Sequence, residues 1–156
     1  MSTGIEKVVF SYADVKDARI LVDIYDSAFH DDYILYGYCP AYGRSIEDME
    51  KSVLDFPKII ASVDGNPVGV ISYQKQDEGS YYIGCLGVKK EYQGKGIGTK
   101  LMTYWMELHS DWEKVTLVTP KDHERNIKFY CKRFGFEIVG EEQDEHVTVL
   151  QFELKR

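Results

Sequence analysis

The sequence predicts a mixed α/β (α+β) fold, with a sheet of about seven strands and helices on both of its faces. Three observations support this prediction. The 156 residues match the size of one domain, so we expect a single folding unit over residues 1–156. Hydrophobic residues make up 44% of the chain and aromatic residues 13%, which is enough for a core. Segments typical of β-hairpins alternate with amphipathic helical segments, and one crossover passes through a helix.

The N-terminal part of the chain contains a strand and two helices. Residues 7–12 are β-branched and aromatic, and Asp14 can cap a helix that follows them. Apolar residues at helical spacing predict that this helix ends near Phe29. Residues 30–43 hold four tyrosines among Gly, Pro and Asp, so we expect an ordered loop there. Ser45 then caps a second helix, which must end before the next proline.

The middle of the chain contains a hairpin and a buried strand. Residues 58–63 and 67–74 flank Asp64-Gly65-Asn66, a sequence suited to a tight reversal. A second reversal leads to residues 80–88. Their apolar run is too continuous for a sheet that is wet on one face, so we place this strand centrally.

The C-terminal part completes the sheet. The helix after the central strand carries one apolar stripe, made of Ile97, Leu101, Trp105 and Leu108. Residues 114–119 read as another buried strand. A further helix covers residues 122–134 and stops at Gly135, and the segments FEIVGEE and HVTVLQFEL form a closing hairpin.

Charge and cysteine content limit the classes of partner. Nineteen basic and 26 acidic residues give a net charge of −7, so we expect no nucleic-acid and no membrane partner. Cys39, Cys85 and Cys131 form no CxxC pair, which favours a reducing cytoplasm over a disulfide framework or a zinc site. The first residues, MSTGIEKVVF, lack the pattern of a signal peptide, and no window resembles a membrane span.

Five residues between the central strand and its helix have the composition of an anion site. In Gly94-Lys95-Gly96-Ile97-Gly98, the glycines let a phosphate approach the backbone N–H groups of a helix N-terminus, and Lys95 adds positive charge. The spacing fits neither GxGxxG nor GxxxxGK[ST], which argues against a dinucleotide or an ATP loop. The alternative is that these glycines only shape a turn.

The residues around these glycines form a longer motif. Gln93, Gly96 and Gly98 fit the pattern Q/R-x-x-G-x-G/A, and the segments CLGVKKEYQGKGIGTKLM and NIKFYCKRFGFEIVG extend the match. In these residues the chain resembles the GNAT superfamily of acyl-CoA-dependent N-acyltransferases, over most of residues 58–154. The resemblance implies a mostly antiparallel GNAT-like sheet whose central strand pair is splayed.

The resemblance also implies acetyl-CoA as cosubstrate. The loop backbone would bind its pyrophosphate, and its pantetheine arm would lie along the central strand and bind main-chain groups. The residues assigned to the cosubstrate in this way are Leu86, Val88, Gln93, Gly94, Lys95, Gly96, Ile97 and Gly98.

Tyr130 is the predicted general acid. It lies in FYCKRFGF, which resembles the FYxKxGF segment of the family, whose tyrosine hands a proton to the departing thiolate. A phenol with a reference pKa of about 10 is protonated at neutral pH, so the proton is available. The alternative is an ordinary half-buried tyrosine. His123 stands where the family commonly has Asn, and a histidine near a helix cap is the other interpretation of that position.

The general base and the acceptor are less defined. Some relatives use a glutamate on the central strand, but Tyr82 occupies the matching position, so another carboxylate must serve. Carboxylates with tyrosines suit an ammonium group, and the resemblance places residues 30–43 beside the acceptor. The predicted acceptor-binding residues are Asp31, Asp32, Tyr33 and Tyr36, with Glu78 and His30 as further candidates for proton transfer. The alternative is that the tyrosines only pack the loop onto the domain.

These observations predict a cytoplasmic enzyme that moves acetyl from acetyl-CoA directly to a primary amine, without a metal. A small cationic amine is the first choice of acceptor. A protein lysine or N-terminal amine is the second, and a CoA-binding regulator without turnover is the third. Whether the chain forms a homodimer is left open.

Overall fold

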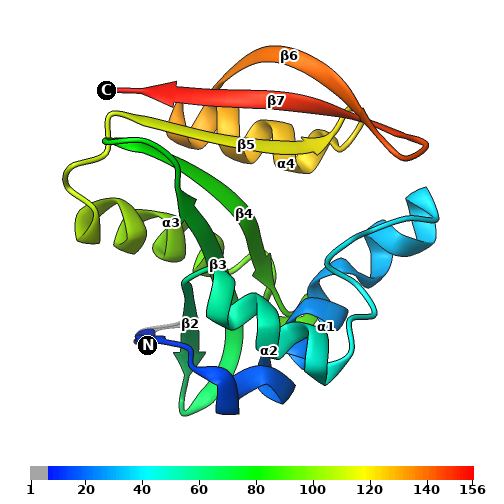
Figure 1. Cartoon of the computed structure of the whole chain (residues 1–156), viewed down its shortest axis with the longest axis vertical. Helices are drawn as coiled ribbons and strands as arrows, with labels where there is room; N and C mark the ends of the chain where they lie inside the picture. The colour runs from blue at the N-terminus through cyan, green and yellow to red at the C-terminus, as the bar shows by residue number, and fades with distance from the viewer. Residues whose placement is uncertain (1–6) are drawn as a thin grey trace. The chain divides into compact units, whose positions relative to one another are not determined.

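The structure is a computed structural model that describes residues 7–156. Residues 1–6, which begin the segment in which we expect no signal peptide, lie outside the described residues. The strands of the sheet follow the order β1-β2-β3-β4-β5-β7-β6 (Figure 1). Their bounds are β1 Val9–Tyr12, β2 Lys58–Val63, β3 Asn66–Lys75, β4 Ser80–Val88, β5 Lys114–Pro120, β6 Glu137–Asp144 and β7 Val147–Lys155. The predicted seven-stranded mixed sheet is confirmed, and the strand at 80–88 has the central place expected for it.

Strand directions also agree with the expected architecture. The pairs β1–β2, β2–β3, β5–β7 and β6–β7 are antiparallel, and β4–β5 is parallel. The β4–β5 register covers only three positions, from Ser80↔Lys114 to Tyr82↔Thr116, although both strands continue beyond them. The β4–β5 pairing is therefore confined to the first residues of both strands.

The chain divides into two compact units. The first unit contains residues up to Tyr73 and residues Cys85–His109. The second unit contains Gln74–Gly84 and Ser110–Arg156. Strand β4 contributes its first half to the second unit and its second half to the first. One domain over residues 1–156 stays a prediction.

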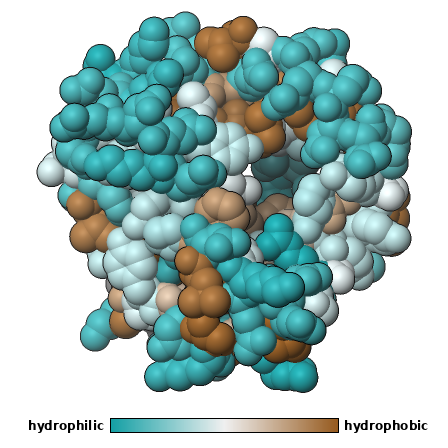
Figure 2. Space-filling view, viewed as in Figure 1, coloured by the Kyte–Doolittle hydropathy of each residue, from teal (hydrophilic) through white to brown (hydrophobic). Residues whose placement is uncertain are grey.

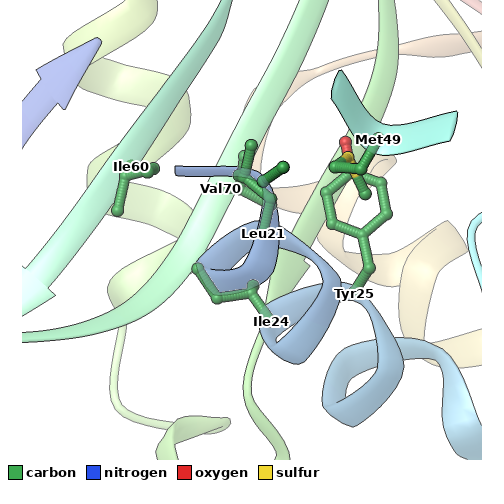
Figure 3. Packing of buried hydrophobic residues seen from close by; sticks show 7 residues of the cluster. Leu21, Ile24, Tyr25, Met49, Ile60 and Val70 are labelled. Atoms are coloured by element: carbon green, nitrogen blue, oxygen red, sulfur yellow. The ribbon is translucent and has the colours of Figure 1, made fainter. Parts of the chain in front are cut away.

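Helices cover both sheet faces of the first unit. On one face, α1 (Ala18–Tyr36) and α2 (Ile46–Asp55) bury a cluster with β2 and β3 (Figure 3). Its members are Ala18, Leu21, Ile24, Tyr25, Met49, Ile60 and Val70. On the other face lies α3 (Ile97–Leu108), whose Leu101 is 3.1 Å from where a Cβ on Gly69 would be. A side chain at position 69 would therefore separate α3 from the sheet.

The predicted hairpin turn is confirmed. Asp64 has φ 52° and Gly65 has φ 80°, the left-handed pair that a tight hairpin requires. The apolar stripe of α3 is confirmed except at its end. Leu108 is 46% exposed, and Met102 is buried beside Ile97, Leu101 and Trp105 instead. Leu108 lies in the last turn of α3.

The loop expected over residues 30–43 is wrong in its first half. Helix α1 continues to Tyr36 and ends at Gly37, which has φ 68° and donates its N–H to Tyr33 O. No glycine or proline interrupts the chain before Gly37, so the tyrosines and aspartates of residues 30–36 stay helical. The predicted acceptor residues therefore lie on the last turns of α1, and only residues 37–45 form a connection to α2.

The second unit combines β5, β7 and β6 with a helix. Helix α4 (Glu124–Lys128) continues as a π-helical segment, η3 (Phe129–Arg133), and the chain turns at Gly135 with φ 80°. The helix predicted for residues 122–134 is thus confirmed, although its second half has wider turns than expected.

On the face shown in Figure 2, hydrophobic residues form separate patches among hydrophilic ones. Within residues 7–156, no helix is long and apolar enough to cross a membrane.

Candidate active site

The glycine loop lies between β4 and α3 in the first unit. A short 3-10 turn, η2 (Lys90–Tyr92), leads into it, and the side chain of Gln93 folds back to donate from Nε2 to Val88 O at 2.9 Å. Gly94 and Gly96 have φ 77° and 85°, conformations that disfavour any residue with a side chain. The loop shape is therefore set by Gln93 and by these two glycines.

The loop fits a phosphate ligand. Gly96 is the N-cap of α3 and supplies no side chain to cap the first N–H groups of the helix. A Cβ built on Gly94 or Gly96 would meet no atom within 4 Å, so the space beside the loop is open. Lys95 is exposed, whereas the side chain of Ile97 is buried and leaves only its backbone for a ligand. Main-chain amides and the exposed ammonium group of Lys95 are therefore available to an anion here.

Leu86 and Val88 present backbone groups at the edge of β4 that faces away from β3. The N–H of Lys89 donates to Val68 O on β3 at 2.8 Å. Backbone groups alternate in direction along an extended chain, so those of Val88 and Leu86 point the opposite way. The Val88 carbonyl already accepts from Gln93 and retains a second lone pair. An extended amide-bearing ligand can pair with such an edge.

Tyr130 belongs to the second unit and lies on η3. Its side chain is 8% exposed, and its ring packs against Phe136 and Phe152 with centroid distances of 5.6 Å and 6.0 Å. Phe136 N donates to Tyr130 O at 3.0 Å. The ring of Tyr130 is therefore firmly held. Single π-helical turns of this kind are frequent at functional sites.

The predicted acceptor residues lie on α1, and the structure brings one of them to the glycine-loop segment. Lys90 Nζ lies 3.2 Å from each carboxylate oxygen of Asp31. Tyr33 stacks on Tyr42 at 4.8 Å, and His30 Nδ1 lies 3.2 Å from Tyr42 OH. Asp32 and Tyr36, also on α1, are half-buried. Part of the predicted tyrosine packing is thus present, between α1 and the connection to α2.

The cysteines do not provide a nucleophile. Burial raises the pKa of Cys85 to about 11, despite the nearby Lys58 ammonium that acts in the opposite direction. Burial also raises the pKa of Cys39 and of Cys131. Only thiolates are strong nucleophiles, and these thiols stay protonated at neutral pH. The protonated state of the three thiols agrees with acetyl transfer that forms no cysteinyl intermediate. Across residues 7–156, His, Cys, Asp and Glu side chains form no group of three that could hold a metal.

Two carboxylates that the sequence did not single out lie near Tyr82 in the second unit. Burial raises the pKa of Tyr82, and the charges of Glu142 and Asp144 on β6 raise it further. The phenol therefore sits in an acidic environment. The sequence shows a run of acidic residues in β6, but no local pattern indicates that this run lies near β4.

His123 has the capping role that was the alternative interpretation of this position. Its Nδ1 accepts from the N–H of Asn126 at 3.3 Å, which caps α4. Asn126 in turn donates from Nδ2 to Thr119 Oγ1 at 2.9 Å and ties the helix start to β5.

Solved structures with similar folds are acetyltransferases. The PaiA N-acetyltransferase from Thermoplasma acidophilum, in complex with coenzyme A, has a TM-score of 0.76 and 17% identity over 93% of this chain and 98% of its own. The acetyltransferase from Thermus thermophilus has a TM-score of 0.78 and 14% identity, over 99% of this chain and 100% of its own. The ribosomal-protein-S18-alanine N-acetyltransferase from Escherichia coli has a TM-score of 0.77 and 13% identity, over 96% of this chain and 94% of its own. These likenesses establish the fold.

Sequence comparison establishes the family. No curated protein sequence gives a match to the chain. The profile of the Acetyltransferase (GNAT) family matches residues 21–136, which include most of α1, the whole of β4, the glycine loop and Tyr130. Proteins of this family transfer an acetyl group and use acetyl-CoA as the donor. The chain therefore belongs to the GNAT family of acetyltransferases.

Proposed function

We propose that this acetyltransferase moves the acetyl group of acetyl-CoA directly to the primary amine of a small cationic acceptor. The observation that carries the proposal is the acidic environment of Tyr82, created by Glu142 and Asp144. Carboxylates attract an ammonium group, and the face of an aromatic ring adds to that attraction. Some relatives have a glutamate on the central strand where this chain has Tyr82, and the charges of Glu142 and Asp144 act at that position.

The chain's own residues take the following roles in the proposed reaction. The main-chain amides of Gln93, Gly94, Lys95, Gly96, Ile97 and Gly98 bind the pyrophosphate. Leu86 and Val88 bind the pantetheine amides through their backbone groups. Glu142 or Asp144 accepts a proton from the acceptor ammonium, directly or through water, because only the neutral amine has the lone pair that attacks the thioester carbon.

Tyr130 completes the proton balance. The new C–N bond forms as the C–S bond breaks, and the sulfur leaves with an electron pair. As the C–N bond forms, the attacking nitrogen releases its surplus proton to water and becomes the amide nitrogen. Tyr130 donates its hydroxyl proton to the departing sulfur, and the phenol later regains a proton from solvent. Asp32, Tyr33 and Tyr36 stay proposed contacts of the acceptor, since they lie on α1 beside the connection to α2.

A protein amine is the second candidate acceptor. Ile34 and Leu35 at the end of α1 are 67% and 71% exposed, and exposed apolar side chains next to each other favour a protein surface as partner. The Escherichia coli neighbour is named for acetylation of an alanine of a ribosomal protein, which is an acceptor of this class.

An amine panel tests the proposal. The purified protein is assayed by CoA release from acetyl-CoA with polyamines, aminoglycosides, amino acids and peptides as acceptors. We expect turnover with small polycationic amines and little with neutral or acidic ones. Turnover with peptides alone would favour the second candidate. CoA binding without release of acetyl to any amine would instead favour a regulator, and the proposed transfer would be wrong.

A further inference from the structure

Helix α1 contacts the segment that carries the glycine loop at Lys90. Lys90 is the first residue of η2, and its backbone N–H donates to Ser27 Oγ on α1 at 2.9 Å. Its side-chain nitrogen lies 3.2 Å from both carboxylate oxygens of Asp31, one turn further along α1. Residues four apart share one face of a helix, so Ser27 and Asp31 form one stripe that holds Lys90 at both its backbone and its side chain.

The hydrogen bond from Lys90 takes the place of a missing local cap. The first N–H groups of a helical turn have no partner within the turn. Lys89, the residue before η2, offers no side-chain cap. The hydroxyl of Ser27, 63 residues earlier in the chain and on another element, accepts the hydrogen bond from the Lys90 N–H instead. The start of η2 is therefore fixed by α1.

The rest of the loop depends on this start. Lys90 O accepts from Gln93 N at 3.3 Å, and Lys89 O accepts from Tyr92 N at 2.8 Å. Gln93 then closes the segment through its bond to Val88 O. A displacement of Lys90 would move Gln93, which is the first residue of the phosphate-binding loop.

The close approach of α1 depends on Gly87. A Cβ at this position would lie 3.0 Å from Phe29 and 3.1 Å from Ala28. These distances are shorter than ordinary van der Waals contact, so only glycine lets α1 lie this near to β4. Because Lys90 is three residues after Gly87, the same approach brings Ser27 within hydrogen-bond reach of Lys90.

We propose that Ser27 and Asp31 are positioning residues for acetyl-CoA, which hold the Gln93–Gly98 loop in its binding conformation through Lys90. The inference rests on the proposed function of that loop. It gives Asp31 a role toward the cosubstrate rather than the acceptor. The proposed acceptor contacts Asp32, Tyr33 and Tyr36 lie further along the same helix.

The test measures CoA affinity without any acceptor. Isothermal titration with CoA is carried out on the wild-type chain, Ser27→Ala, Ser27→Thr, Asp31→Asn and Asp23→Asn. Loss of the hydroxyl should raise the Kd for CoA about five-fold, and Ser27→Thr should restore it. Asp31→Asn should raise the Kd about two-fold, because the pair is exposed and screened by water. Asp23, an exposed carboxylate one turn before Ser27, is the matched control and should leave the Kd unchanged.

Steady-state kinetics and a double variant separate positioning from direct contact. Ser27→Ala and Asp31→Asn should raise the KM for acetyl-CoA and leave the acceptor KM unchanged. In a Lys90→Met background, Asp31→Asn should have no further effect on the Kd. Hydrogen exchange by mass spectrometry should be faster over residues 90–98 in Asp31→Asn, a readout that also serves if Ser27→Ala does not fold.

The outcomes distinguish a failure of the positioning role from a failure of the proposed acetyl-CoA-dependent function. If the wild-type chain binds no CoA, the proposed function fails. If the wild-type chain binds CoA but Ser27→Ala or, where that variant is unfolded, Asp31→Asn shows wild-type Kd and wild-type exchange, the positioning role is overturned alone. A rise in the acceptor KM for Asp31→Asn, with acetyl-CoA unaffected, would return Asp31 to the acceptor.

Discussion

The ammonium nitrogen of Lys58 lies 2.9 Å from the hydroxyl oxygen of Ser72, its partner directly across the β2–β3 pair. Lys58 is 2% exposed and lies under the rings of Tyr25 and Phe56, at 5.7 Å and 6.0 Å from their centroids. No carboxylate pairs with it among the described residues. Burial, with a smaller effect of the Arg44 charge, lowers the pKa of Lys58 from 10.5 to about 8. The protein thus carries a buried cation held by a hydroxyl and two π faces.

This lysine should make folding stability rise with pH. Above pH 10.5 both the folded and the unfolded chain hold neutral Lys58. As the pH falls from 10.5 to about 8 the unfolded chain takes up the proton first, so the free energy of unfolding decreases, by about 3 kcal/mol for a shift of this size. We expect Lys58→Met to raise the free energy of unfolding at pH 7 by about 1 to 2 kcal/mol, after the lost bond to Ser72 is counted. The gain should shrink by pH 10, measured by urea denaturation.

Lys51 provides the control, because it is an exposed lysine on α2 in the same unit. Lys51→Met should change the free energy of unfolding by less than about 0.5 kcal/mol at either pH. Equal changes for Lys58→Met at pH 7 and pH 10 would contradict a depressed pKa.

Substitution by alanine should destabilise the fold more at Gly87 than at Gly140, although the closest contact of the added Cβ is shorter at Gly140. A Cβ at Gly140 would lie 2.5 Å from Gln151 Oε1, closer than the 3.0 Å between a Cβ at Gly87 and Phe29. The Gln151 amide is the free end of a flexible side chain and can turn away, whereas Phe29 and Ala28 belong to the packed face of α1. Gly87→Ala should therefore destabilise the fold by about 1 to 3 kcal/mol, and Gly140→Ala by less than about 1 kcal/mol. Thermal unfolding of both variants compares them, and a larger loss for Gly140→Ala would contradict this interpretation of α1 packing.

Local sequence patterns predicted the elements well, because the signals lie within a few residues of one another. The Asp64-Gly65 turn, the Ser45 cap and the strand that runs into the glycines were all predictable. The end of α1 was predicted incorrectly because residues 30–36 were judged by their tyrosine content, whereas the first true interruption is Gly37. The wider turns of η3 have no sequence signal that we recognise.

The candidate site was predictable only where one segment holds it. The glycine loop and Tyr130 each lie in a short motif, so both could be assigned a role by resemblance. The partner of Asp31 is 59 residues away, and the charge of Glu142 acts on Tyr82 from a different strand. Such pairs depend on how strands and helices are placed, and neither composition nor periodicity contains that placement.

Glu142 and Asp144 should set the affinity for the acceptor. Glu142→Gln and Asp144→Asn each remove one negative charge near Tyr82, so the acceptor KM for a polycationic amine should rise about three- to ten-fold per substitution. The KM for acetyl-CoA should not change. Glu137→Gln, an exposed acid at the other end of β6, is the matched control. A wild-type acceptor KM in both variants, measured by CoA release, would remove these carboxylates from the acceptor site.

Tyr130→Phe should lower turnover while the fold stays intact. The ring is held by Phe129, Phe136 and Phe152, and phenylalanine preserves those contacts. The substitution removes only the hydroxyl, so the melting temperature should stay within a few degrees of wild type and the Kd for CoA should not change. Without a donor for the departing sulfur, kcat at saturating substrates should fall at least about a hundred-fold.

Leaving-group acidity provides a second measurement on the same variant. In an acyl donor whose thiol has a lower pKa than that of CoA, the thiolate can leave without being protonated. With such a donor, the difference in kcat between wild type and Tyr130→Phe should be smaller. Cys131→Ala, which alters the neighbouring residue of η3, is the control and should turn over at the wild-type rate. If Tyr130→Phe keeps more than half of the wild-type kcat with acetyl-CoA, another group protonates the sulfur. Tyr130 would then be a packing residue of the second unit.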